Sequence, residues 1–159
     1  MESATVTARI DATMVRAGEG ERLNVAGDIV RVLLDSAGSG GAIAAFEVIS
    51  QPGGGPPLHR HEKEDELFFV LEGEATFVVG GDRHLIRSGE SIFAPRGSIH
   101  TFGNTGAGTL RMIVVCTSGG LERPFREVDA MGDGMTPERL MAAFVEHGVR
   151  FLGPPIGSE

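Results

Sequence analysis

The chain has 159 residues, of which 41% are hydrophobic and 23% are charged, and its formal net charge is -8 at pH 7. This composition predicts one domain with one core and argues against a disordered chain. The acidic balance and the absence of Tyr and Trp argue against a nucleic-acid partner, because such proteins gather Lys and Arg on one surface and stack bases on aromatic rings.

Residues 1–19 are expected to form an N-terminal arm, and residues 20–117 an all-β region. Glycines, 24 in the chain, separate short segments rich in Val, Ile, Phe and Thr, which is typical of short strands. The expected strands are Arg22–Val25, Ile29–Leu34, Ile43–Ile49, Leu67–Glu72, Ala75–Val79, Arg83–Ile86, Ser91–Ala94, His100–Asn104 and Leu110–Cys116. Turns at Glu72-Gly73 and Gly80-Gly81 predict antiparallel hairpins, because glycine readily adopts the positive φ of hairpin turns.

Residues 118–159 are expected to form a helical appendage that packs on the β region. Thr136 is a favourable N-cap, Pro137 suits the first helical position, and Gly148 is placed to end this helix. A shorter helix is expected over Pro124–Ala130, with the proline in its first turn.

Three of the five histidines and one glutamate fall into two short blocks. Side chains alternate along an extended strand, so His59 and His61 project to the same side and their imidazoles converge on one point. Glu66 begins the next strand, from which its carboxylate can reach that point. His100, in the second block, supplies a third imidazole at the start of another strand.

The spacing of both blocks resembles the two motifs of the cupin superfamily. The first block, Gly53–Gly73, reads G-x5-H-x-H-x4-E-x6-G, and the second, Gly89–Asn104, reads G-x5-P-x-G-x2-H-x3-N. The resemblance covers about residues 20–117 and implies a double-stranded β-helix, which is a jelly-roll barrel. The metal ligands that it implies are His59, His61, Glu66 and His100.

Three imidazoles and one carboxylate suit a divalent transition metal, namely Fe, Mn, Co, Ni, Cu or Zn, and the donor set does not choose among them. The absence of cysteine ligands favours a site with open positions over a closed structural site. Glu66 is then also the candidate catalytic residue, because a carboxylate that leaves the metal can accept a proton from a substrate hydroxyl. His84 and His147 lie outside both blocks and are not expected to belong to the site.

Strand alternation also predicts the wall of a substrate pocket beside the metal. Phe68 and Val70 follow Glu66 at even spacing, and Phe102 follows His100, so these three side chains are expected to line an apolar pocket. Such a pocket favours a flat aromatic ligand. The acidic residues before Glu66 are expected to be solvated charges at the entrance to the strand, namely Glu62, Glu64 and Asp65.

Within the superfamily, the block that begins at His59 and the tail Gly148–Pro155 are similar to small bacterial cupins akin to quercetin 2,3-dioxygenase. This resemblance implies metal-dependent dioxygenation of an enolic or phenolic, flavonol-like small molecule, with Glu66 as the base. The same barrel hosts other functions. Two alternatives stay open: a metal-assisted non-redox enzyme, such as a polyketide cyclase or an isomerase, and a non-catalytic small-molecule binder or sensor.

The chain has no run of about 18 apolar residues, and its single cysteine, Cys116, is compatible with a reducing compartment. We therefore expect a cytoplasmic protein with a small-molecule partner and neither a membrane nor a nucleic-acid partner. Single-domain cupins often form homodimers. The strands Arg22–Val25 and Ile29–Leu34 are the expected elements of a two-fold interface.

Overall fold

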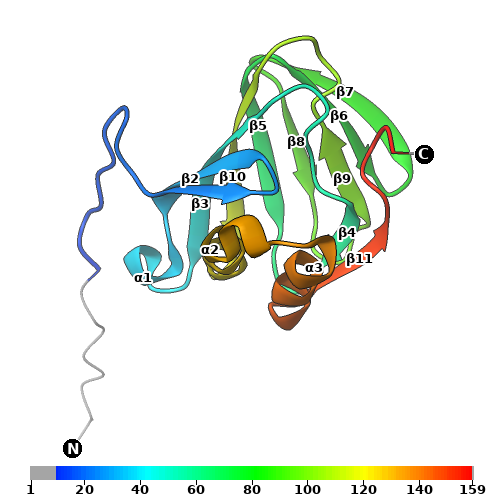
Figure 1. The fold of residues 1–159 in the computed structure, drawn as a ribbon. Helices are drawn as coiled ribbons and strands as arrows, with labels where there is room; N and C mark the ends of the chain where they lie inside the picture. Colours follow the sequence, from blue (N-terminus) through cyan, green and yellow to red (C-terminus); the bar gives the residue numbers. More distant parts are fainter. Residues whose placement is uncertain (1–9, 159) are drawn as a thin grey trace, which may run out of the picture.

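Two antiparallel sheets pack against each other in the computed structural model, which describes residues 10–158 (Figure 1). The larger sheet has the strand order β1-β2-β3-β10-β5-β8, and the smaller has the order β11-β4-β9-β6-β7. The strands are β1 (Arg22–Val25), β2 (Asp28–Leu34), β3 (Ile43–Ser50), β4 (Leu58–His61), β5 (Glu66–Glu72), β6 (Glu74–Val79), β7 (Asp82–Arg87), β8 (Ser91–Ala94), β9 (His100–Gly103), β10 (Leu110–Thr117) and β11 (Val149–Gly153). The helices are α1 (Ser36–Ser39), α2 (Glu122–Met131) and α3 (Pro137–Glu146), with a 3-10 turn, η1, at Gly132–Gly134.

Alternation along the strands decides which side chains form the core. In β5, Phe68 and Val70 are buried, whereas Leu67 and Phe69, on the opposite face, are 44% and 41% exposed. Phe77 of β6 meets Phe68 from the other sheet, with ring centroids 5.1 Å apart. The core therefore lies between the two sheets, as the predicted all-β barrel requires.

One of the two predicted glycine hairpins is present, and the prediction of the other is wrong. Strands β6 and β7 pair antiparallel around Gly80-Gly81, as expected. At Gly73, however, the chain passes from the larger sheet to the smaller, so β5 and β6 do not pair with each other. Glycine is required there for another reason: at φ 79°, a Cβ would lie 2.6 Å from the carbonyl oxygen of Thr109.

The two C-terminal helices lie next to each other at one end of the barrel (Figure 1). In α3, the Thr136 side chain accepts a hydrogen bond from the backbone N–H of Arg139, and Pro137 is the first helical residue, as predicted. Helix α2 begins at Glu122, two residues before the expected start. The Glu122 side chain is buried, and it accepts hydrogen bonds from the Ser36 hydroxyl and backbone N–H.

The segment after α3 returns to the barrel as β11, a strand that the sequence reading did not predict. It pairs antiparallel with β4 and forms the edge of the smaller sheet. Residues 118–159 thus supply a barrel strand as well as helices. No helix among residues 10–158 is both long and apolar enough to span a membrane.

The edge of the larger sheet bears on the expected homodimer. Strand β2 pairs with β1 on one side and with β3 on the other, so only β1 presents an open edge at this end of the sheet. Pairing through β1 across a two-fold axis stays a prediction, as does the cytoplasmic location.

Candidate metal centre

The four expected ligand residues come together at one place in the barrel. His59 and His61 lie on β4, Glu66 is the first residue of β5, and His100 is the first residue of β9. All four are buried, and one ligand atom from each lies within 4.8 Å of the others. Glu66 Oε2 lies 2.7 Å from His100 Nε2 and 3.2 Å from His61 Nε2. The group has the size of a site for a single ion.

Strand pairing holds the ligands in register. Along β4, His59 and His61 are buried while Arg60 between them is exposed, as alternation predicts. His59 is paired with His100 on β9, which places their imidazoles side by side with ring centroids 4.6 Å apart. On the other side, β4 is paired with β11. Strand pairing therefore aligns the three histidines, whereas Glu66 reaches the cluster from β5 of the larger sheet.

Each of the three imidazoles engages an oxygen atom through Nδ1. The oxygens belong to Pro57 for His59 (2.7 Å), Glu64 for His61 (3.1 Å) and Ser98 for His100 (3.1 Å). Those of Pro57 and Ser98 are backbone carbonyls, which only accept, so Nδ1 of His59 and of His100 carries a proton and donates it. A metal ion would then bind Nε2 of each ring, which is the arrangement usual for metal-binding histidine, and would replace the contact between His100 Nε2 and Glu66 Oε2.

The charge states of the cluster also suit a metal ion. Burial, together with the neighbouring His100 and His61, lowers the pKa of His59 to about 3, so this imidazole is neutral. Burial opposes the charge of Glu66, but the nearby His61 and His100 outweigh this effect and lower the pKa of the carboxyl. Metal binds to neutral imidazole and to ionised carboxylate, which are the forms of His59 and Glu66. Burial lowers the pKa of His61, but the nearby Glu66 and Glu64 outweigh this effect and raise it, so a metal ion would displace a proton from this imidazole. These residues therefore fit a divalent transition metal ion.

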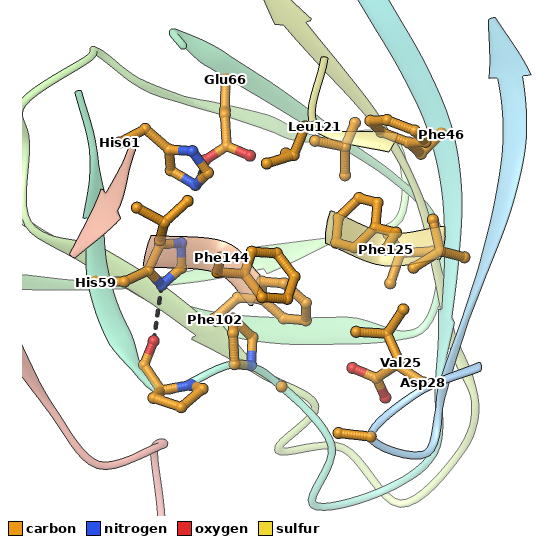
Figure 2. A pocket seen from close by; sticks show the side chains of 18 of the residues that line it. Val25, Asp28, Phe46, His59, His61, Glu66, Phe102, Leu121, Phe125 and Phe144 are labelled. Carbon is orange, nitrogen blue, oxygen red and sulfur yellow. Dashed lines mark hydrogen bonds and ion pairs between the residues drawn. The ribbon is translucent and has the colours of Figure 1, made fainter. Parts of the chain in front are cut away.

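A cavity of about 140 Å³ opens beside the cluster, and His59, His61 and Glu66 form part of its wall (Figure 2). Most of the remaining wall is apolar and comes from both sheets and from both C-terminal helices. Its aromatic residues are Phe46, Phe68, Phe102, Phe125, Phe144 and Phe151. The ring of Phe125 on α2 meets those of Phe46 and Phe144 edge-on, at centroid distances of 5.2 and 5.5 Å. The helices thus close the apolar side of the cavity.

Comparison with known proteins agrees with this arrangement. Residues 46–116 match the cupin domain family. A predicted oxalate decarboxylase from Thermotoga maritima, a solved structure, is 30% identical and superposes with a TM-score of 0.59, covering 67% of this chain and 99% of that one. The chain belongs to the cupin superfamily.

Two further relatives show the range of functions around this cupin. The polyketide cyclase RemF from Streptomyces resistomycificus is 29% identical, with a TM-score of 0.60, over 68% of this chain and 80% of that one. Quercetin 2,3-dioxygenase from Bacillus subtilis is 30% identical over 92 residues, which are 56% of this chain and 26% of the dioxygenase. The present chain thus spans about a quarter of the length of that curated relative.

Two of the three predicted pocket residues line the cavity, and the third does not. Phe68 and Phe102 line the cavity of the cupin, whereas Val70 is fully buried in the core and is absent from the lining. Val70 shares the inner face of β5 with Glu66, but it lies four residues further along, which is about 13 Å in a strand. Alternation gives the face of a residue and not its distance from the site.

The acidic residues before Glu66 are not all solvated charges, and the expectation is wrong for Glu64. Glu64 is 4% exposed, and its carboxylate faces the Nδ1 of His61. Asp65 accepts hydrogen bonds from the backbone N–H of Arg96 at 2.8 Å and from its guanidinium at 2.9 Å. The two cupin motifs are therefore tied together by an ion pair, and Glu64 supports a ligand.

Replacing Glu64 with alanine is expected to weaken metal binding about 10- to 100-fold, the usual cost of losing a group that orients a ligand. The loss follows because His61 would keep its imidazole but lose the acceptor that fixes its orientation. Competition for zinc with a chromogenic chelator measures the change. Glu62→Ala is the matched control, since Glu62 is exposed and pairs with Arg150. Equal affinity of the two variants would contradict the role of Glu64.

Proposed function

We propose that this cupin is a metal-dependent dioxygenase that acts on a small enolic or phenolic molecule. The observation that carries the proposal is the position of the cluster: His59, His61 and Glu66 form one wall of a cavity that is otherwise largely apolar. A purely structural metal site would not need to face a cavity, whereas an enzyme needs both the ligands and room for a substrate.

Glu66 is the residue that we assign to proton transfer. A divalent metal bound here would act as a Lewis acid that favours loss of a proton from a bound hydroxyl and, if redox-active, would permit reaction with dioxygen. Glu66 Oε2 lies between Nε2 of His61 and Nε2 of His100, so it is within reach of a hydroxyl held at the same point. Burial opposes the charge of Glu66, but the nearby His61 and His100 lower its pKa, so it is ionised and can accept a proton. A carboxylate of low pKa is a weak base, so the metal ion would have to acidify the hydroxyl first.

The volume of the cavity limits the substrate. At about 140 Å³, it is close to the roughly 150 Å³ of an engineered protein cavity that binds benzene. Pockets for drug-sized ligands begin at about 300 Å³. We therefore place single-ring phenols and small enols ahead of three-ring flavonols, which would require α2 and α3 to move outward.

The deciding experiment is to reconstitute the protein separately with each candidate metal and to follow oxygen uptake against a panel of catechols and enols. We expect uptake with a redox-active metal and none with zinc, and both atoms of isotopically labelled dioxygen should appear in the product. Conversion at equal rates with zinc and without oxygen uptake would contradict the oxidative proposal.

A metal-assisted, non-redox reaction is the second candidate. It is favoured by the likeness to the polyketide cyclase RemF. That likeness extends over 80% of RemF, whereas the likeness to the dioxygenase extends over 26% of the dioxygenase. The same residues would serve it, because proton removal by Glu66 also begins a cyclisation or an isomerisation. Binding without conversion under any metal would instead favour the non-catalytic sensor.

A further inference from the structure

A single carboxyl group interrupts the apolar wall of the cavity away from the metal cluster. Asp28, the first residue of β2, lines the cavity, and Figure 2 shows it across the cavity from His59 and His61. Among the described residues that line the cavity, Asp28 is the one ionisable side chain outside the cluster. The cavity therefore offers polar groups at two separate places.

The carboxyl group of Asp28 is fixed through one of its oxygens. The buried Ser50 donates a hydrogen bond from Oγ to Asp28 Oδ1 at 2.6 Å. Gly54 makes room for this pair, since a Cβ there would lie 2.2 Å from Ser50 Oγ and 2.5 Å from Asp28 Oδ1. Within residues 10–158, Asp28 Oδ2 accepts no hydrogen bond. One oxygen is thus held and the other is available to a ligand.

The hairpin that carries Asp28 is also anchored. Ala26 and Gly27 form its turn with φ values of 55° and 98°, which suit a two-residue hairpin. The Gly27 N–H donates to the Asn24 side chain at 3.0 Å, and the Asn24 N–H donates to Asp129 of α2 at 2.8 Å. Asp28 is therefore held in position relative to the helices that close the cavity.

We propose that Asp28 is a specificity-determining residue that accepts a hydrogen bond from a second hydroxyl, at the end of the ligand remote from the metal. The inference rests on the proposed function for the other end of the ligand. The ligand class is then a single-ring apolar molecule with an enolic or phenolic oxygen at one end and a hydroxyl at the other.

The surroundings of Asp28 support this role. Burial raises the pKa of Asp28, although the hydrogen bond from Ser50 opposes the shift. A carboxylate among apolar walls is stabilised by each donor that reaches it. The hydroxyl of a ligand would supply the donor that the cavity wall does not.

Calorimetric binding to the zinc-loaded protein tests the inference without any turnover. The probes are catechols with alkyl chains of increasing length, each in one version that ends in a hydroxyl and one that ends in a methyl group. The unmodified protein should bind the hydroxyl-ended probe of matching length about 10-fold more tightly, as expected for a hydrogen bond to a charged group.

Two substitutions at Asp28 and one control complete the design. Asp28→Asn keeps an acceptor for Ser50 but removes the charge, so the preference should fall to about 3-fold or less. Asp28→Leu should abolish it. Asp82→Asn should leave it unchanged, because Asp82 also begins a strand after a two-residue turn but is exposed and lies outside the cavity.

The outcomes separate this inference from the proposed function. Equal binding of both probe versions by the unmodified protein, or a preference that survives in the Asp28 variants, would overturn the role of Asp28 and leave the proposed function standing. Failure of every catechol to bind would overturn both. If Asp28→Leu does not fold, Asp28→Asn alone decides.

Discussion

Replacing His61 with alanine is expected to strip the protein of its metal while leaving the barrel folded. His61 supplies one of the four ligand atoms, and its loss should cost more than the roughly 10- to 100-fold that the loss of a supporting group costs. The fold should persist because the apolar core between the sheets does not include the cluster. Elemental analysis of protein purified without chelators, together with circular dichroism, measures both parts.

His84→Ala is the matched control for this experiment. His84 lies on β7, is exposed, and does not belong to the cluster, so its loss should change neither the metal content nor the fold. Full metal content in the His61→Ala protein would refute the ligand assignment. Loss of the fold together with the metal would show instead that the cluster is needed for stability.

Substituting Glu66 by glutamine is expected to lower turnover about 100- to 10,000-fold, which is the usual contribution of a positioned general base. Glutamine keeps the size and one oxygen donor but removes the charge and the basicity, so part of the metal and of the substrate binding should remain. Turnover at saturating metal, normalised to the metal content of each preparation, separates the loss of a base from the loss of a ligand.

Glu72→Gln is the matched control, because Glu72 ends the same strand but is exposed and lies outside the cluster. Its turnover should equal that of the unmodified protein. Unchanged turnover in metal-loaded Glu66→Gln would exclude Glu66 as the base and leave it a ligand only. If the protein is a sensor, neither form turns over and the two differ only in affinity.

The ligand cluster could be predicted from the sequence because local rules determine most of it. Alternation places His59 and His61 on one face, and the motif spacing adds Glu66 and His100. The role of Glu64 could have been suspected from its place three residues after His61, yet nothing in the sequence distinguishes it from the exposed Glu62. Burial of the one and exposure of the other depend on how the whole loop packs.

Of the cavity wall, only Phe68 and Phe102 could be predicted, because the rest depends on contacts between distant segments. Phe125 and Phe144 reach the cavity from helices that follow the barrel in sequence, and Asp28 reaches it from a hairpin near the beginning. The strand β11 was missed for the same reason: Val149–Gly153 is short, and it pairs with β4, about 90 residues earlier, where Phe151 faces His59. Local pattern carries no signal of such pairing.

The pairing of β4 has a consequence for the order in which the site is built. This strand, which carries two of the four ligands, is paired with β9 at a single position, His59 with His100, but with β11 at four positions. Contacts between such distant segments require the closure of long loops and tend to form late in folding. We therefore expect the ion-binding geometry to be complete only once the C-terminal segment has docked, so that a metal ion would enter a barrel that has already closed.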